Sequence, residues 1–168
     1  TRWSITAVDS TLGLALMEKT RTYPKISEYR IYEHTQLDNR WIIMMLPREW
    51  CFELIEAWYP GTIWNPSARK IEIFGDHEFH DGRSDYAQIG GCYYASRLAV
   101  NELLGKEQRQ AGVCVWREAH PGYVMPVGVW NVREAVRAAL QNRPRTYRTL
   151  KEVFGRVQEK MEIPLKRW

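Results

Sequence analysis

The residues best suited to chemistry gather in a polar segment from Gly75 to Ile89, GDHEFHDGRSDYAQI. Four carboxylates and two imidazoles lie within it, and such side chains could hold a divalent metal suited to phosphodiester chemistry. The candidate ligands are Asp76, His77 and His80. Their spacing matches no established metal motif, because His77 and His80 lack the i, i+4 spacing of zinc proteases. We therefore expect a solvated, hydrogen-bonded loop without a cofactor, with a divalent metal as the alternative.

A second group follows the apolar run from Ala111 to Trp116, which predicts a buried strand. Strand ends are where open α/β sheets place their sites, so Arg117 and Glu118 are candidates for a cation and a general base. With the loop carboxylates Asp81 and Asp85 they would form the catalytic set of a metal-dependent nuclease or another phosphodiester enzyme. The alternative is a buried structural pair that locks the strand end to a helix at Arg133-Glu134. No catalytic motif of high specificity is present, so the sequence leaves open whether the protein is an enzyme.

Positive charge is concentrated in the C-terminal half of the chain. Residues 91–168 hold 14 Lys and Arg against 7 Asp and Glu, whereas residues 1–90 hold 10 against 13. A basic strip can contact nucleic-acid phosphates without reading the base sequence, although a solvated helix face would look the same. Gly90-Gly91 at a helix start could add backbone N–H donors for a phosphate. The nucleic-acid-binding candidates are Arg97, Arg143, Arg145, Arg148, Lys151 and Arg156.

The elements that must position these residues indicate one α+β domain over residues 1–168. Alternating or apolar runs predict an N-terminal antiparallel β-meander in a strand-rich half, residues 1–90. A C-terminal α-β-α layer is expected to pack against it from a helix-rich basic half, residues 91–168. The expected strands are 27–33, 41–46, 51–59, 69–74 and 111–116, and the expected helices are 93–104, 129–140 and the segment after the capping box Thr149–Glu152. Residues 1–24 show no firm period, and Leu12–Met17 suits either a short strand or a short helix.

The composition narrows the class of protein further. The chain has 168 residues, 45% of them hydrophobic and 26% charged, which is typical of a folded domain. Its three cysteines show neither an even count nor metal-ligand spacing, so we expect a reducing, cytoplasmic setting. No apolar run reaches the length of a membrane span. The 8 Trp and 9 Tyr residues are expected mainly in the core, and exposed ones would favour a protein-interaction scaffold.

Five stretches of the sequence are distinctive: EAWYPGTIW (56–64), GRSDYA (82–87), GGCYYASRLAVNELL (90–104), RQAGVCVWREAHPGYVMPVGVWNVREAVRAAL (109–140) and IPLKRW (163–168). Together they resemble the C-terminal part of the archaeal Nre family of DNA repair proteins. The resemblance covers the chain from about Trp41 to its end, and its most specific stretch is Arg109–Leu140.

The resemblance implies a cytoplasmic DNA-repair protein that acts with the replication sliding clamp. Family members carry a clamp-binding peptide just beyond the region that matches Ile163–Trp168, and this sequence stops before it. Some members also carry an N-terminal zinc motif, for which no cysteine pair is present here. The resemblance supplies no catalytic residues. The leading hypothesis is a repair-associated protein that contacts DNA through its basic half; a metal-dependent nuclease and an interaction scaffold are the alternatives.

Overall fold

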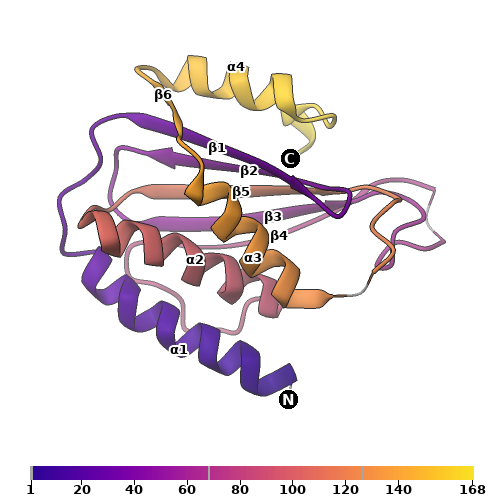
Figure 1. Ribbon diagram of the computed structural model, residues 1–168, viewed down its shortest axis with the longest axis horizontal. Coiled ribbons are helices and arrows are strands. Elements are labelled where there is room, and N and C mark those ends of the chain that lie inside the picture. Colours follow the sequence, from indigo (N-terminus) through magenta and orange to yellow (C-terminus); the bar gives the residue numbers. More distant parts are fainter. Residues whose placement is uncertain (1, 68, 126) are drawn as a thin grey trace.

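The computed structural model describes residues 2–67, 69–125 and 127–168, and arranges them as helices on both faces of a six-stranded sheet (Figure 1). The elements in chain order are α1 Arg2–Thr20, β1 Tyr29–Gln36, β2 Asn39–Leu46, β3 Cys51–Trp58, β4 Glu72–Glu78, α2 Gly91–Glu107, β5 Gly112–Ala119, α3 Gly128–Gln141, β6 Arg145–Tyr147, α4 Leu150–Lys160 and the 3-10 turn η1 Leu165–Arg167.

The sheet combines two hairpins that are not neighbours. Its strand order is β4-β3-β5-β2-β1-β6, so β5 pairs between the β1–β2 and β3–β4 hairpins. β5 runs antiparallel to β2 and parallel to β3. Every residue of β5 is buried, as expected for a central strand covered on both faces. Leu37 and Asp38 close the β1–β2 turn with positive φ angles of 49° and 54°, the conformation that a tight hairpin needs.

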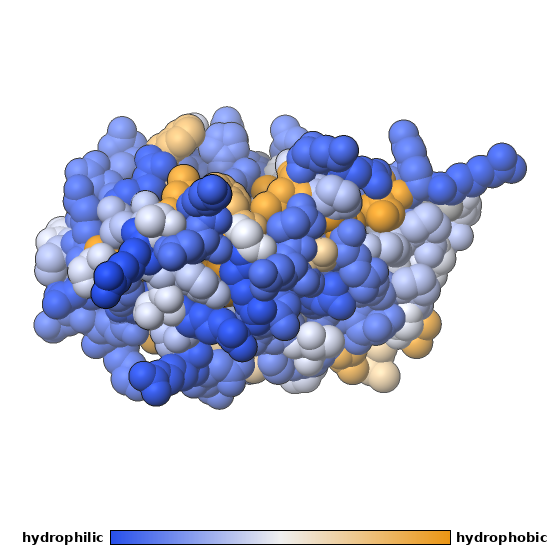
Figure 2. Space-filling view, turned by 90° about the horizontal axis from the view of Figure 1, so that it is seen from above, coloured by the Kyte–Doolittle hydropathy of each residue, from blue (hydrophilic) through white to orange (hydrophobic). Residues whose placement is uncertain are grey.

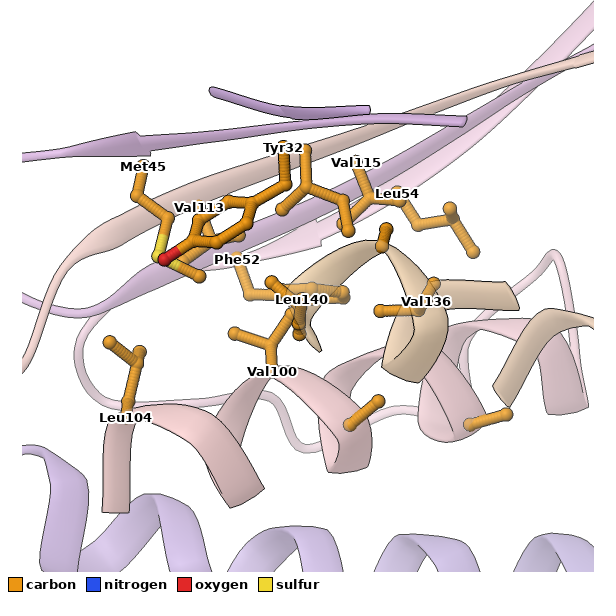
Figure 3. Close-up of a cluster of buried hydrophobic side chains, with 14 of the residues drawn as sticks. Tyr32, Met45, Phe52, Leu54, Val100, Leu104, Val113, Val115, Val136 and Leu140 are labelled. Atoms are coloured by element: carbon orange, nitrogen blue, oxygen red, sulfur yellow. The ribbon is translucent and has the colours of Figure 1, made fainter. Parts of the chain in front are cut away.

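The larger core lies between the sheet and the helices α2 and α3 (Figure 3). Alternate side chains of β2, β3 and β5 point toward these helices and pack against their apolar faces. The labelled members of this core are Tyr32, Met45, Phe52, Leu54, Val100, Leu104, Val113, Val115, Val136 and Leu140.

A smaller core lies on the opposite face, beneath α4. Val153 and Val157 of α4 pack on Ile42 and Trp116 of the sheet. The Thr149 hydroxyl accepts from the backbone N–H of Glu152, and the Glu152 carboxylate accepts from the backbone N–H of Thr149, which confirms the expected capping box. Figure 2 looks onto this side and shows a largely hydrophilic face with apolar side chains between the polar ones.

α1 forms an additional outer layer on α2 (Figure 1). Side chains of α1 and α3 meet α2 at Gly91, where a Cβ would lie 2.6 Å from Cγ1 of Val129 and 2.7 Å from Oγ1 of Thr6. Only glycine fits that contact without a shift of the neighbouring side chains. The packing therefore ties the first turn of α2 to both α1 and α3.

The expected α+β class is confirmed. The expected N-terminal meander is interrupted, because β5 of the C-terminal half pairs between β2 and β3 in the same sheet. Two local expectations were also incomplete. The strands expected at 27–33, 41–46, 51–59 and 111–116 and the helices at 93–104 and 129–140 are present with shifted ends. The N-terminal segment forms a continuous helix from Arg2 to Thr20. Its sequence shows no clear apolar period, since most of its buried or partly buried positions are small or polar. The last expected strand of the meander lies at Glu72–Glu78, so it extends into the segment expected to be a loop.

Candidate functional site

Arg117 lies inside the protein, among aromatic side chains at the end of β5. It is 1% exposed, and its guanidinium carbon lies 4.9 Å from the ring centre of Trp41 and 4.6 Å from that of Trp58. Nη1 donates to Glu56 at 2.8 Å and Nε donates to Asn39 at 2.8 Å. Burial lowers the pKa of Arg117, but the adjacent carboxylate of Glu56 raises this pKa and helps to outweigh burial. The net shift is upward, so the side chain stays charged.

The partner of Arg117 is not the one expected from the sequence. The expected structural pair joined the Arg117-Glu118 strand end to Arg133-Glu134, whereas Arg117 pairs with Glu56 of β3 and Arg133 pairs with Asp9 of α1. Adjacent residues of a strand point to opposite faces, so Arg117 and Glu118 cannot act on one group. Glu56 was not among the predicted site residues. A carboxylate within the otherwise apolar stretch from Leu54 to Trp58 is the sequence signal that could have pointed to this cluster.

Glu118 holds the C-terminal segment on the opposite face of the sheet. Its buried carboxylate accepts from the backbone N–H of Ile163 at 2.8 Å and of Glu162 at 3.2 Å, and from Arg40 at 3.3 Å. Beside it, the rings of His120 and Tyr59 lie 4.5 Å apart between centres. Burial and the carboxylates of Glu118 and Glu162 raise the pKa of Tyr59 to about 12. These contacts make Glu118 a structural anchor.

The polar segment after β4 is organised by an ion pair. Arg83 donates through two nitrogens to the Asp76 carboxylate, at 2.7 and 3.0 Å, and the backbone N–H of Gln88 donates to the same carboxylate at 2.6 Å. Burial raises the pKa of Asp76, but the hydrogen bonds from Arg83 and from the backbone of Gln88 and His77 lower it more, so it lies below its usual value. The Asp76 carboxylate therefore stabilises this segment through its hydrogen bonds to Arg83 and Gln88.

The other metal and catalytic candidates of this segment lie at the surface. His77 packs edge-on against Phe79, and Asp81 is fully exposed and lies 3.6 Å from His80. Asp85 is exposed as well. Among residues 2–67, 69–125 and 127–168, no group of three or more His, Cys, Asp or Glu side chains is placed to hold a metal ion. No hydrogen bond or ion pair between described residues joins Asp81 or Asp85 to Arg117 or Glu118.

The Asp76–Arg83 pair makes stability depend on pH. Because the folded-state pKa of Asp76 is depressed, its contribution is present above the unfolded value of about 4 and is lost as pH falls through the folded value. We expect Asp76→Asn to be less stable than the parent at pH 6, with the difference narrowing toward pH 3 in urea unfolding. Asp81→Asn, at a fully exposed carboxylate, is the matched control and should match the parent at both values. An Asp76→Asn difference that is independent of pH would contradict the assignment.

Two of the six nucleic-acid-binding candidates are occupied by partners within the protein. Arg97 is 3% exposed, and its Nη1 donates to the buried Glu78 at 2.8 Å. The same carboxylate accepts from Nε1 of Trp50 at 3.1 Å. Arg156 is half-buried and donates to Glu33 at 2.8 Å. The structure therefore places Arg97 away from any surface that a phosphate could reach.

The other four candidates lie together along the chain at one edge of the sheet. Arg143 and Arg145 flank Pro144 at the end of α3 and the start of β6, and Arg148 and Lys151 follow at the start of α4. All four side chains are exposed, and none makes an ion pair with a described residue. We call these four residues the basic edge surface. The interior arginines meet carboxylates, whereas these cations face solvent.

Among the described residues, no helix combines the length and the apolar character that a membrane span requires. The fold and its charges define an α+β protein with structural ion pairs in its interior and free cations at one edge. The chain belongs to the archaeal Nre family. Residues 78–168 match the model described as "Archaeal Nre, C-terminal", and residues 1–65 match "Archaeal Nre, N-terminal".

Three curated relatives are similar over nearly the whole chain. The "DNA repair protein NreB" of Archaeoglobus fulgidus is 40% identical over 100% of this chain and 43% of its own length. The "DNA repair protein NreA" of the same organism is 34% identical over 96% of this chain and 41% of its own length, and that of Haloferax volcanii 36% over 98% and 40%. The chain thus spans about two fifths of these relatives. No solved structure matches the chain significantly.

Proposed function

We propose that the protein takes part in DNA repair and contacts DNA through the basic edge surface. The relatives named for DNA repair support the process. The observation that carries the contact is the exposure of Arg143, Arg145, Arg148 and Lys151 within nine residues, without a carboxylate partner among the described side chains. Elsewhere in the basic half the arginines at 97, 117, 133, 137 and 156 meet acidic side chains.

The local geometry favours side-chain contacts to phosphates. The N-terminus of α4 is poorly suited to an anion. The Glu152 carboxylate accepts from the backbone N–H groups of Arg148 and Thr149 just before the helix, the Thr149 hydroxyl accepts from the N–H of Glu152, and the carboxylate itself repels an anion. Its hydrogen bonds to the Thr149 hydroxyl and to those two N–H groups lower the pKa of Glu152, so it stays charged. Binding therefore depends on the four exposed cations, and we infer affinity for the DNA backbone rather than for a base sequence.

The test is a fluorescence-anisotropy titration of single-stranded, duplex and forked DNA with the parent chain and the triple variant Arg143→Glu, Arg145→Glu and Arg148→Glu. We expect the parent to bind more weakly as salt rises, and the triple variant to lose about 100-fold or more of its affinity at low salt. Each lost phosphate contact should lower the salt-dependence slope by about 0.9 for duplex DNA.

The matched control is Lys19→Glu, Arg69→Glu and Lys70→Glu, which changes net charge equally at three exposed positions outside the basic edge surface. This control should retain most of the affinity. Equal losses in the two triple variants would show that overall charge matters and not this surface. Endpoints run on a gel with and without Mg²⁺ or Mn²⁺ also test the nuclease alternative, since metal-dependent cleavage would favour it. Action with the sliding clamp stays a prediction from the resemblance.

A further inference from the structure

Most of the larger apolar side chains of α1 are exposed. Its buried or partly buried positions are mostly small or polar, Thr6, Asp9, Ser10, Gly13 and Thr20, with Leu16 and Met17 as the large apolar members. A stripe beside this packed face, on the α3 side, carries Ile5, Val8 and Leu12, spaced three and four residues apart. A surface helix normally turns its large apolar residues toward the core, so three exposed ones on one stripe call for an explanation.

The outer stripe is open to solvent in this chain. Ile5, Val8 and Leu12 are 44, 53 and 52% exposed. Between Ile5 and Met17 the only charged residue is Asp9, which is buried and paired with Arg133. A helix face that stays in water normally carries charged side chains, and a contiguous apolar stripe marks an interaction surface. The absence of cations from this part of α1 also makes it unsuited to nucleic acid.

A groove between α1 and α3 continues the stripe. Ile5, Val8, Asp9 and Arg133 line this groove, which has a volume of about 210 Å³. Nη1 of Arg133 donates to Oδ1 of Asp9 at 2.6 Å, while Oδ2 of the same carboxylate is buried without a hydrogen-bond partner among the described residues. Trp130, one helical turn before Arg133, is half exposed at the same end of α3. The groove therefore combines apolar walls with an ion pair at its base.

We propose that this surface, Ile5, Val8 and Leu12 with the α1–α3 groove, docks an apolar segment of the additional polypeptide that longer Nre proteins carry. The curated relatives extend well beyond the match, which covers 43% or less of each. α1 belongs to the part of the chain that matches the N-terminal family model. The docked segment buries the stripe and covers the Asp9–Arg133 ion pair. This contact is independent of the basic edge surface.

The first test measures solvent access in a chimera in which this chain replaces the matching region of Archaeoglobus fulgidus NreB. Leu12→Cys reports on the stripe, and Leu14→Cys is the matched control, because Leu14 is 45% exposed on another side of the same helix. Maleimide labelling followed by peptide mass spectrometry separates the new thiol from the three native cysteines. We expect Leu12→Cys to label at least tenfold more slowly in the chimera than in the chain alone, with Leu14→Cys unchanged.

Equal labelling of Leu12→Cys in the two proteins would overturn the proposal. Protection of Leu12→Cys in the chain alone that rises with concentration would assign the surface to a second copy, and would overturn it too. A second measurement needs no chimera. Hydrogen–deuterium exchange of the natural Archaeoglobus protein, in the peptide that matches residues 2–20, should be slower in the full-length protein than in its isolated matching region. Identical exchange in these two would also contradict the docking.

Discussion

Replacing Glu56 with Gln is expected to lower the free energy of unfolding by about 3–5 kcal/mol, because it leaves the Arg117 guanidinium buried without an anion. The substitution nearly preserves the side-chain volume, so the loss reports the charge and not a cavity. Arg117 cannot move to water, since Trp41, Trp58 and Tyr123 surround its guanidinium. Urea unfolding of the parent and the variant measures the difference.

Two further variants test this interpretation of the buried pair. The double variant Glu56→Gln with Arg117→Met removes both charges and should recover part of the lost stability, because no buried charge remains unpaired. Glu159→Gln breaks a more exposed pair with Arg156 and should change the stability by less than about 1 kcal/mol. If Glu56→Gln were as mild as Glu159→Gln, the pair would not be a structural element, and a catalytic role for Arg117 would regain support.

Replacing Glu118 with Ala is expected to cost about 3 kcal/mol or more and to free the segment that follows α4. The carboxylate accepts two backbone N–H groups and Arg40 in a site closed to water, and hydrogen bonds to a charged group contribute about 1.5–3 kcal/mol each. We expect the amides of Glu162 and Ile163 to exchange faster while the β1–β2 hairpin stays protected. Hydrogen exchange and urea unfolding of the same sample measure both effects.

The matched control for Glu118 is Glu162→Ala, which removes an exposed carboxylate that contacts Arg40 and His120. It should alter stability only slightly. A Glu118→Ala protein with parental stability and exchange, but with altered behaviour on DNA, would contradict the structural assignment and restore Glu118 as a candidate for chemistry. The two outcomes therefore separate the anchoring role from a catalytic one.

The proposed DNA contact and the proposed docking surface differ in their physical basis. The basic edge surface gains its affinity from charge, so raised salt should weaken it. The α1 stripe gains affinity from apolar burial, which moderate salt does not weaken. One titration across salt concentrations can therefore distinguish a loss of DNA binding from a loss of docking in a single full-length protein.

The sequence determined the elements whose pattern is local. The alternating and apolar runs of β1, β2, β3 and β5 and the capping box of α4 follow from side-chain periods and turn chemistry, which act over a few residues. The family resemblance was also in the sequence, and the family models that match 1–65 and 78–168 confirm it. The net positive charge of the C-terminal half could likewise be counted directly.

Only the tertiary structure decided which charges remain available for binding. Arg97 and Arg143 are the same residue type in one basic half, yet Arg97 meets Glu78 inside the protein and Arg143 faces solvent. Glu56 and Arg117 are far apart in the sequence and meet because β5 inserts beside β3. Ion pairs of this kind depend on which strands and helices become neighbours, and the residue spacing along one chain does not specify that. For the same reason the helix α1 could not be predicted from the sequence, because its inner face is defined by close packing on α2 and not by a hydrophobic period.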